Sequence, residues 1–344
     1  MDGAGSAVVL RGVNVSGTEF SCIQGGEASS RGWSIYGGQP LTAGSTYAGV
    51  VSWRANVVRV PLNEDCWLGI NGVNPSYGGA AYRRAIHDEV SAIHAAGLLV
   101  VLDLHWSAPG AYAASSQQPM ADADHSVDFW RSVAADFRAD PAVVFDLYNE
   151  PYFYWISDGS DQWSCWLNGC QMNQFVTANQ PGPNGQSTGY SMAMSWRTAG
   201  MQQLVDAVRS TGATQPIIVN GVDWANDVSG WWSHRPTDPA GQLIAGWHSY
   251  MGQPCGTSSC WNGVIAPLAG NVPVLVGETG DQATSAATYL PTFLPWADAH
   301  GINYLAWTWN VWDNPDNVLI RAWDGSVPTT GEGTYYRDHL RSLG

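Results

Sequence analysis

The sequence predicts an α/β fold, a single (β/α)8 barrel domain with long βα loops that spans residues 1–344. Three observations predict it. Short apolar runs rich in β-branched residues recur eight times, helix-like segments separate most of them, and nearly every run ends in a polar residue. Apolar strands that alternate with helices are typical of parallel sheets. Eight such units fit a closed barrel better than an open sheet, and no G-x-G-x-x-G motif follows the first run.

The expected elements follow in chain order. Strands are expected at 8–15, 57–62, 98–105, 143–150, 216–222, 243–250, 273–278 and 304–310. Helices are expected at 79–96, 126–138, 190–211 and 284–300. The stretch 177–189 (TANQPGPNGQSTG) is rich in Pro, Gly and Asn, which predicts a surface loop. No repeat and no charged or proline-rich linker divides the chain, so we expect one catalytic domain without an appended module.

Composition excludes several classes of protein. With 45% hydrophobic and 12% charged residues, the chain is not disordered. All 14 basic residues are Arg, and 29 acidic residues leave a net charge of −15, so nucleic acid is not an expected partner. No apolar run approaches the roughly 18 residues of a membrane span, so no membrane partner is expected either. Nineteen tryptophans exceed what a core can use, which indicates that some indoles stack against a ligand.

Six cysteines indicate an oxidising compartment. They allow fifteen pairings, and the sequence alone does not choose among them. Two close pairs make Cys165–Cys170, Cys255–Cys260 and Cys22–Cys66 the natural arrangement. The chain begins MDGAGS, which we interpret as a mature start whose signal peptide has been removed, so secretion is expected.

Polar residues at the expected strand ends point to one site. The active site of such a barrel lies at the carboxyl ends of its strands. The residues there are Asn14, Arg59, His105, Asn149, Glu150, Asp223, His248, Tyr250, Glu278, and Trp307 or Trp309.

Two carboxylates stand out among them. Glu150 ends the fourth expected strand and Glu278 the seventh, so they would face each other across the mouth. A structural ion pair with Arg59 is the alternative interpretation. Retaining glycosidases place two carboxyl groups about 5–5.5 Å apart, one as acid/base and one as nucleophile.

An ordered set of motifs resembles glycoside hydrolase family 5, the cellulase family of the barrel glycosidase clan A. Order and spacing match over essentially the whole chain. The motifs are RGVN at 11–14, RVPL at 59–62, LDLHW at 102–106, YNEP at 148–151, HSY at 248–250, GE at 277–278 and WTWN at 307–310.

The resemblance implies a role for each matching residue. Glu150 would be the general acid/base, protonated by virtue of a raised pKa, and Glu278 the nucleophile. Asn149 would bind the sugar 2-hydroxyl. Arg59 and Tyr250 would orient Glu278, and His105 and His248 would line the −1 subsite. Trp307 would be the sugar platform, with Trp309 as the alternative, and Trp106 is a further expected substrate-site residue.

Rival sites are weaker. Ser191 lies in a Gly-Tyr-Ser-Met-Ala segment that resembles a nucleophile elbow, but no strand is expected before it, and we expect a helix start. Asp313 and Asp316 offer oxygens for calcium without EF-hand spacing, so a solvated loop is expected. Short C-x-x-C or H-x-H spacing typical of zinc is absent. We therefore expect no metal and no cofactor.

Aromatic and acidic residues on the expected mouth loops suggest sugar subsites. Indole faces stack on sugar rings, and carboxylates accept hydrogen bonds from hydroxyls. The candidates are Trp155, Trp163, Trp166, Trp231, Trp232, Trp261 and Trp312, with Glu64, Asp65, Asp158 and Asp161.

These observations predict a secreted, monomeric, metal-independent, retaining endo-β-1,4-glucanase whose partner is a cellulose-like β-glucan polysaccharide. A β-mannanase or a mixed-linkage or β-1,3-glucanase is the alternative within the same chemistry. The alternative from another class is a non-catalytic glycan-binding barrel, against which the presence of both Glu150 and Glu278 argues.

Overall fold

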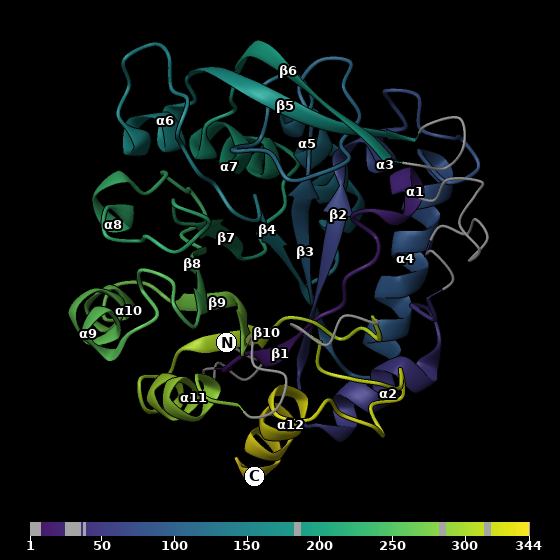
Figure 1. Ribbon diagram of the computed structural model, residues 1–344, viewed down its shortest axis with the longest axis vertical. Helices are drawn as coiled ribbons and strands as arrows, with labels where there is room; N and C mark the ends of the chain where they lie inside the picture. The colour runs from purple at the N-terminus through teal and green to yellow at the C-terminus, as the bar shows by residue number, and fades with distance from the viewer. Residues whose placement is uncertain are drawn as a thin grey trace.

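The computed structural model describes residues 8–24, 36, 39–181, 187–281, 287–312 and 318–343. At its centre eight parallel strands form a closed barrel (Figure 1). Pairing of the first strand with both the second and the last closes the ring, which confirms the predicted (β/α)8 fold. The strands are β1 (Arg11–Asn14), β2 (Val57–Asn63), β3 (Leu99–Trp106), β4 (Val143–Asp146), β7 (Ile217–Asn220), β8 (Leu243–Tyr250), β9 (Val274–Gly280) and β10 (Asn303–Ala306).

Helices cover the outside of the barrel. On α4 the buried side chains include Ile86, Val90 and Ile93, a spacing that places one apolar stripe against the strands. The longer helices are α2 (Gly44–Ser52), α4 (Ala80–Ala95), α5 (Ser126–Phe137), α7 (Met201–Ser210), α11 (Leu290–Ala299) and α12 (Glu332–Ser342). The short ones are α1 (Ser21–Gln24), α3 (Glu64–Leu68), α6 (Gln162–Asn168), α8 (Trp231–His234), α9 (Ser258–Cys260), the π-helical turn η1 (Trp261–Ile265) and α10 (Ala266–Ala269).

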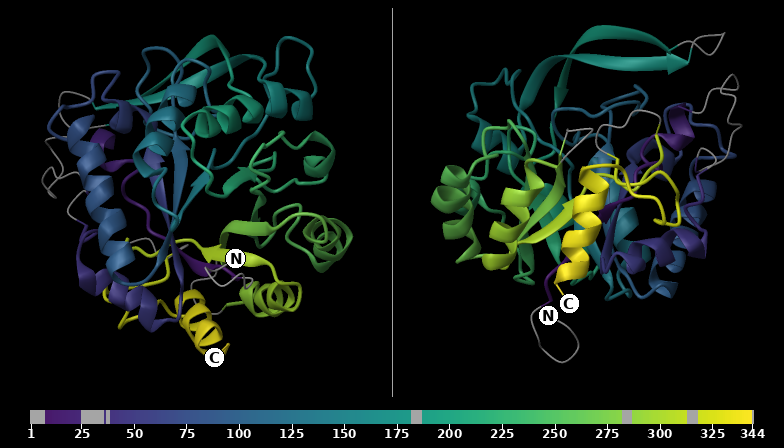
Figure 2. Two further views of the ribbon diagram at one scale, coloured as in Figure 1. Left: turned by 180° about the vertical axis from the view of Figure 1, so that it is seen from behind. Right: turned by 60° about the horizontal axis from the view of Figure 1, so that its bottom comes forward.

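An antiparallel hairpin, β5 (Gln171–Pro181) and β6 (Ser187–Arg197), lies outside the barrel sheet. Figure 2 shows it crossing the end of the barrel opposite the two termini. The predicted loop at 177–189 and the first part of the predicted helix at 190–211 are therefore wrong. Residues 182–186 of the predicted loop lie outside the described residues. The strand signal was present in β6, where Tyr190, Met192, Met194 and Trp196 recur at every second residue. This segment was interpreted as the start of a helix instead.

The interior of the barrel has two layers of different chemistry. The lower layer is apolar and includes Val57, Val101, Val144, Ile218, Leu275 and Leu305. Side chains two residues apart on a strand point the same way, so the next layer toward the carboxyl ends contains Arg59, Asp103, Asp146 and Asn220, all buried. Gly246 leaves room for it, because a Cβ there would lie 1.9 Å from Asn220 Oδ1. The sequence thus builds a polar layer directly beneath the mouth.

All six cysteines form disulfides, in the expected pairs Cys22–Cys66, Cys165–Cys170 and Cys255–Cys260. Their Cα–Cα distances are 6.0, 4.9 and 5.2 Å, within the usual range. Among helices of the described residues, none is both long enough and apolar enough to span a bilayer. The single-domain extent over 1–344 stays a prediction.

Candidate active site

Arg59 is the centre of the buried polar layer. It lies on β2 with a fully buried side chain. Burial lowers the pKa of a guanidinium, but the carboxylates around Arg59 outweigh this and raise its pKa, so the cation is fixed. Its partners, all at 2.9–3.0 Å, are Asn14, Asp103, Asp146, Asn149 and Glu278.

Two hydrogen bonds hold the side chain of Glu278, which lies on β9. Arg59 Nη1 donates to its Oε1 at 3.0 Å, and the Tyr250 hydroxyl donates to its Oε2 at 2.8 Å. Burial raises the pKa of Tyr250 well above its ordinary value, so the phenol keeps the proton that it donates. One cation and one neutral donor therefore fix the orientation of the Glu278 carboxylate.

Glu150 lies opposite, just beyond β4, on a segment that the structure places outside the strand. His248 Nδ1 is 2.8 Å from Glu150 Oε1 and 3.8 Å from Glu278 Oε2. A carboxylate oxygen of Glu150 lies within 4.8 Å of one of Glu278. Burial raises the pKa of Glu150, although His105 opposes the shift. Burial lowers the pKa of His248 to about 3, so a neutral imidazole faces a carboxyl group that tends to keep its proton.

His105 is held between an acid and an indole. Its Nδ1 is 2.6 Å from Asp103 Oδ2, and its ring stacks on Trp307 with centroids 5.4 Å apart and planes 11° apart. Burial lowers the pKa of His105 to about 4, so the ring is neutral at ordinary pH. The stack fixes the plane of Trp307, whose side chain lines the pocket described below.

Asn149 connects the polar layer to a long loop. Its Oδ1 accepts from Arg59 at 2.9 Å, and its Nδ2 donates to Gln117 Oε1 at 3.3 Å. Gln117 in turn donates to the backbone carbonyl of Glu150 at 2.9 Å. The β3–α5 loop, residues 107–125, therefore braces both Asn149 and Glu150.

A pocket of about 450 Å³ opens above these groups. Glu150 and Glu278 line it, whereas Arg59, His105, Asn149 and His248 are not among its lining residues. Its lining residues are Glu150, Trp224, Asn226, Tyr250, Gln253, Glu278 and Trp307.

Trp224, Asn226 and Gln253 were missed by the sequence analysis. Asp223, Trp224 and Ala225 follow β7 with φ angles of 56°, 55° and 59°, a conformation that non-glycine residues rarely adopt. Trp224 stacks on Tyr152 with centroids 4.8 Å apart and planes 20° apart. Its position just after the fifth barrel strand was the available signal, but no local pattern predicts such a turn.

Two of the predicted substrate-binding indoles are placed differently from expectation. Trp309 is fully buried, packs edge-on against Trp53 at 4.7 Å and donates its N–H to the Trp323 carbonyl, so we drop it from the site. Trp106 is half-buried at the end of β3, 6.3 Å from Phe20, and is not a lining residue of the pocket.

Four of the seven mouth-loop tryptophans considered as subsite candidates are buried, and for the other three the expectation stays a prediction. Three of these buried indoles donate their N–H to a backbone carbonyl. Trp166 donates to Asn220, Trp231 to Val219 and Trp261 to Cys255. Trp163 is also buried, whereas Trp155 and Trp232 are exposed and Trp312 is half-buried.

The predicted acidic subsite residues serve the protein itself. Glu64 and Asp65 are fully buried at the start of α3. Asp158 accepts from the Gln171 backbone, and Asp161 caps α6 through the Trp163 and Ser164 amides.

Ser191 and the acidic segment after the last strand were the two rival sites. Ser191 lies within β6 rather than at a strand-to-helix turn. The proposed calcium oxygens at 313–317 lie outside the described residues.

An eight-stranded parallel barrel whose mouth presents two facing carboxyl groups is the architecture of the barrel glycosidases. The chain belongs to the cellulase family, glycosyl hydrolase family 5, which matches residues 2–313. It is therefore a glycoside hydrolase by family.

Known proteins similar to the chain fall into two groups. A mannan endo-1,4-β-mannosidase from Streptomyces lividans is 23% identical over 322 residues, and one from Cellvibrio japonicus is 21% identical over 319. The alignments cover 90% of this chain but only 64% and 57% of those proteins.

Among solved structures, a β-glucanase from Saccharophagus degradans has a TM-score of 0.68 at 19% identity, covering 100% of this chain and 90% of that one. An endo-β-1,4-glucanase from Xanthomonas axonopodis pv. citri has a TM-score of 0.64 at 18% identity, covering 97% and 100%. At these identities the likeness shows the fold.

Proposed function

We propose that the protein is a retaining endo-β-1,4-glucanase that hydrolyses internal bonds of cellulose-like chains by double displacement. The separation of the two carboxyl groups carries the proposal. One carboxylate oxygen of Glu150 lies within 4.8 Å of one of Glu278, which fits the spacing of about 5–5.5 Å between carboxyl groups in retaining enzymes better than the about 6.5–9.5 Å in inverting ones.

The mechanism follows from the environments of the two acids. Glu278, held by Arg59 and Tyr250, attacks the anomeric carbon and forms a glycosyl–enzyme ester. Glu150 protonates the departing glycosidic oxygen, and its raised pKa keeps that proton available. In the second half-reaction Glu150 takes a proton from water, which attacks the ester and releases the sugar with its original configuration.

The remaining site residues position the sugar. The Asn149 amide, fixed by Arg59 and Gln117, would bind the 2-hydroxyl of the reacting ring. Trp307, braced by His105, would provide the stacking surface beneath that ring. Neutral His248 would hold Glu150 without adding charge between the two acids.

Substrate choice rests on the relatives. A solved structure of the Saccharophagus degradans β-glucanase contains cellotetraose, and the fold covers that chain almost completely, which favours a glucan. The curated relatives are mannosidases, which favours a β-mannanase as the second candidate. Apart from the two catalytic glutamates, the pocket lining consists of aromatic and amide side chains, which suits either neutral polymer. The three disulfides support secretion, and a monomeric state remains part of the proposal.

Single isosteric substitutions test the catalytic pair. We expect Glu150→Gln and Glu278→Gln each to lose at least about 10³-fold in kcat on carboxymethylcellulose, because each removes a covalent or proton-transfer role. Glu89→Gln, a buried glutamate on α4 away from the mouth, is the matched control and should retain activity. Full activity in either site variant would refute the mechanism.

A substrate panel separates the candidates. Initial rates on cellulose, lichenan, mannan and xylan should be highest on a β-1,4-glucan. Faster hydrolysis of mannan would replace the glucanase assignment with a mannanase. Binding of glycan without turnover by the native chain would favour a non-catalytic barrel.

A further inference from the structure

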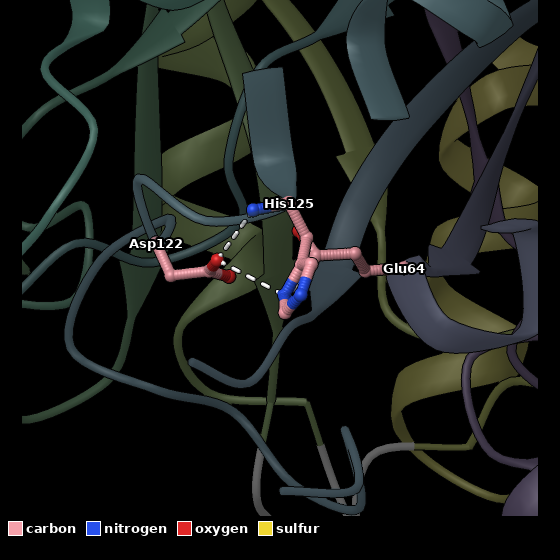
Figure 3. Close-up of side chains that lie close together, drawn as sticks. All are labelled: Glu64, Asp122 and His125. Carbon is pink, nitrogen blue, oxygen red and sulfur yellow. Dashed lines mark hydrogen bonds and ion pairs between the residues drawn. The ribbon is translucent and has the colours of Figure 1, made fainter. Parts of the chain in front are cut away.

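A second cluster of ionisable side chains lies beside the barrel mouth, outside the catalytic pocket. Glu64 begins α3, while Asp122 and His125 come from the end of the 107–125 loop, just before α5. Figure 3 shows the three side chains converging. One ligand-type atom from each lies within 4.8 Å of the others. Glu64 and Asp122 have fully buried side chains, and His125 is 23% exposed.

Two atoms in this cluster have no hydrogen-bond partner among the described residues. They are Glu64 Oε1 and His125 Nδ1, which face each other at 3.9 Å. Nδ1 is also 3.3 Å from Asp122 Oδ1 without forming a hydrogen bond. A buried carboxylate oxygen without a partner is costly, and here it points at a second unpartnered atom.

The surrounding contacts fix the two carboxylates. The Asp122 Oδ1 atom accepts from the backbone amides of Asp124 and His125 at 3.0 and 2.8 Å. The Ser126 hydroxyl lies 2.5 Å from Glu64 Oε2 and 3.2 Å from Asp122 Oδ2. A single hydroxyl has one proton to donate, so Ser126 donates to only one of the two carboxylates at a time.

We propose that Glu64, Asp122 and His125 bind a divalent transition metal, with zinc as the best match, as a structural ion. One imidazole and two carboxylates suit zinc better than calcium or magnesium, which prefer oxygen ligands alone. Tetrahedral zinc places its ligands roughly 3.3–3.5 Å apart, against 3.3 and 3.9 Å from Nδ1 to the two carboxylates. Water would be the fourth ligand of a tetrahedral ion held by these three side chains.

Such an ion would tie the 107–125 loop to α3. The same loop carries Gln117, which contacts Asn149 and the Glu150 backbone. Metal binding would therefore stabilise the loop that braces one side of the catalytic pocket. The sequence predicted no metal because its ligands come from segments far apart in the chain.

The test is a metal-binding measurement on the full chain produced without a histidine tag. After removal of metals with dipicolinate and equilibration with Zn²⁺, mass spectrometry of the protein should find one zinc per chain. At a hundredfold excess over Kd, zinc should raise Tm by about 2–4 °C. Zinc should also slow hydrogen exchange in residues 107–125.

Variants identify the ligands. His125→Ala and the milder His125→Gln should lose the zinc. His94→Ala is the matched control, since His94 is similarly exposed and pairs with Asp140 elsewhere, and it should retain zinc. Glu150→Gln should also retain zinc, which separates this site from the catalytic acids.

Three results would overturn the proposal. They are the absence of stoichiometric zinc in the native chain, zinc retained in both His125 variants, and saturation by Ca²⁺ or Mg²⁺ but not by Zn²⁺. In the first case a shared proton would be the group that offsets the charge of Glu64 and Asp122. Because the readouts are metal content and stability, the test is independent of the glucanase proposal.

Discussion

At the scale of single residues, one buried arginine organises the site. Arg59 contacts three carboxylates and two amides inside the barrel. Burial raises the pKa of Asp103 and Asp146, and the Arg59 guanidinium opposes that shift. The planar guanidinium is suited to several directional contacts at once. The Arg59 side chain inside the barrel therefore orients both Glu278 and Asn149. The 107–125 loop adds one contact, from Gln117 to Asn149.

Tyr250 tests how much orientation contributes to catalysis. Tyr250→Phe removes only the hydroxyl that donates to Glu278 Oε2 at 2.8 Å. We expect kcat to fall by roughly 10–100-fold with little change in KM, corresponding to about 1.5–3 kcal/mol for a hydrogen bond to a charged group. Steady-state kinetics measures it. Tyr289→Phe, which loses a hydroxyl contact to Ser249 away from the carboxylates, is the control, and an equal loss there would contradict the assignment.

Trp224 tests the aromatic wall that only the structure revealed. Its ring lines the pocket beside Glu150 and stacks on Tyr152. Trp224→Ala should raise KM for soluble oligosaccharides by roughly 5–20-fold, about 1–2 kcal/mol of lost stacking, with a smaller effect on kcat. Trp232→Ala, an exposed indole outside this pocket, should leave KM unchanged. An unchanged KM in the Trp224 variant would remove this residue from the substrate site.

At the scale of elements, the barrel strands were predicted and the hairpin was missed. Buried strands are recognisable in the sequence by their apolar runs. The polar residues at the ends of these runs identified Glu150 and Glu278 as candidate site residues. The hairpin strands β5 and β6 form no part of the barrel sheet. The period-two recurrence of Tyr190, Met192, Met194 and Trp196 indicates a strand, but a helix was expected there. Trp307 and Trp309 illustrate a second limit. They differ by two residues, yet one lines the pocket and the other is core, because the chain leaves the strand at Ala306.

The disulfides make an element-scale prediction about stability. Cys22–Cys66 joins the segment after β1 to α3 and closes 44 residues, whereas Cys165–Cys170 closes five. In the loop-entropy treatment the first should contribute about 4 kcal/mol and the second about 2 kcal/mol. Denaturant unfolding of the two double Cys→Ala variants measures the difference. A larger loss from the short loop would show that chain entropy does not govern these crosslinks.

At the scale of the whole molecule, buried acids set the response to pH. Burial raises the pKa of both Glu19 and Glu89 to about 8. The native state therefore holds protons that the unfolded state releases above its ordinary pKa near 4.5. Burial lowers the pKa of His105 to about 4 and of His248 to about 3, so these two destabilise the fold only as pH falls below about 6.5.

The free energy of unfolding should consequently fall between pH 6.5 and 8. In this interval the histidines no longer titrate, and Glu19 and Glu89 lose on unfolding the protons that they hold in the native state. Glu89→Gln removes one of these acids while keeping an acceptor for Tyr47. This change should reduce the loss of unfolding free energy across that interval by roughly 1–2 kcal/mol. Denaturation at both pH values measures it. Asp88→Asn, an exposed neighbour on α4, should leave the slope unchanged, and an unchanged slope in the Glu89 variant would contradict the account.

The whole-molecule view also changes the meaning of the tryptophan surplus. Composition alone suggested a broad sugar-binding ring, but most of those indoles pack under loops that cover the barrel. Whether an indole faces the core or the solvent depends on tertiary packing, which local sequence does not encode. The order of strand-end motifs, in contrast, reflects the barrel itself, and it correctly placed Glu150 and Glu278 together.

The central claim is that two closely spaced carboxylates hydrolyse the glycosidic bond with retention. Proton NMR during the first minutes of cello-oligosaccharide hydrolysis tests it most directly, before mutarotation mixes the anomers. The 4.8 Å limit on the distance between Glu150 and Glu278 oxygens predicts that the β-anomer appears first and the α-anomer only later. Initial appearance of the α-anomer would contradict double displacement at this site.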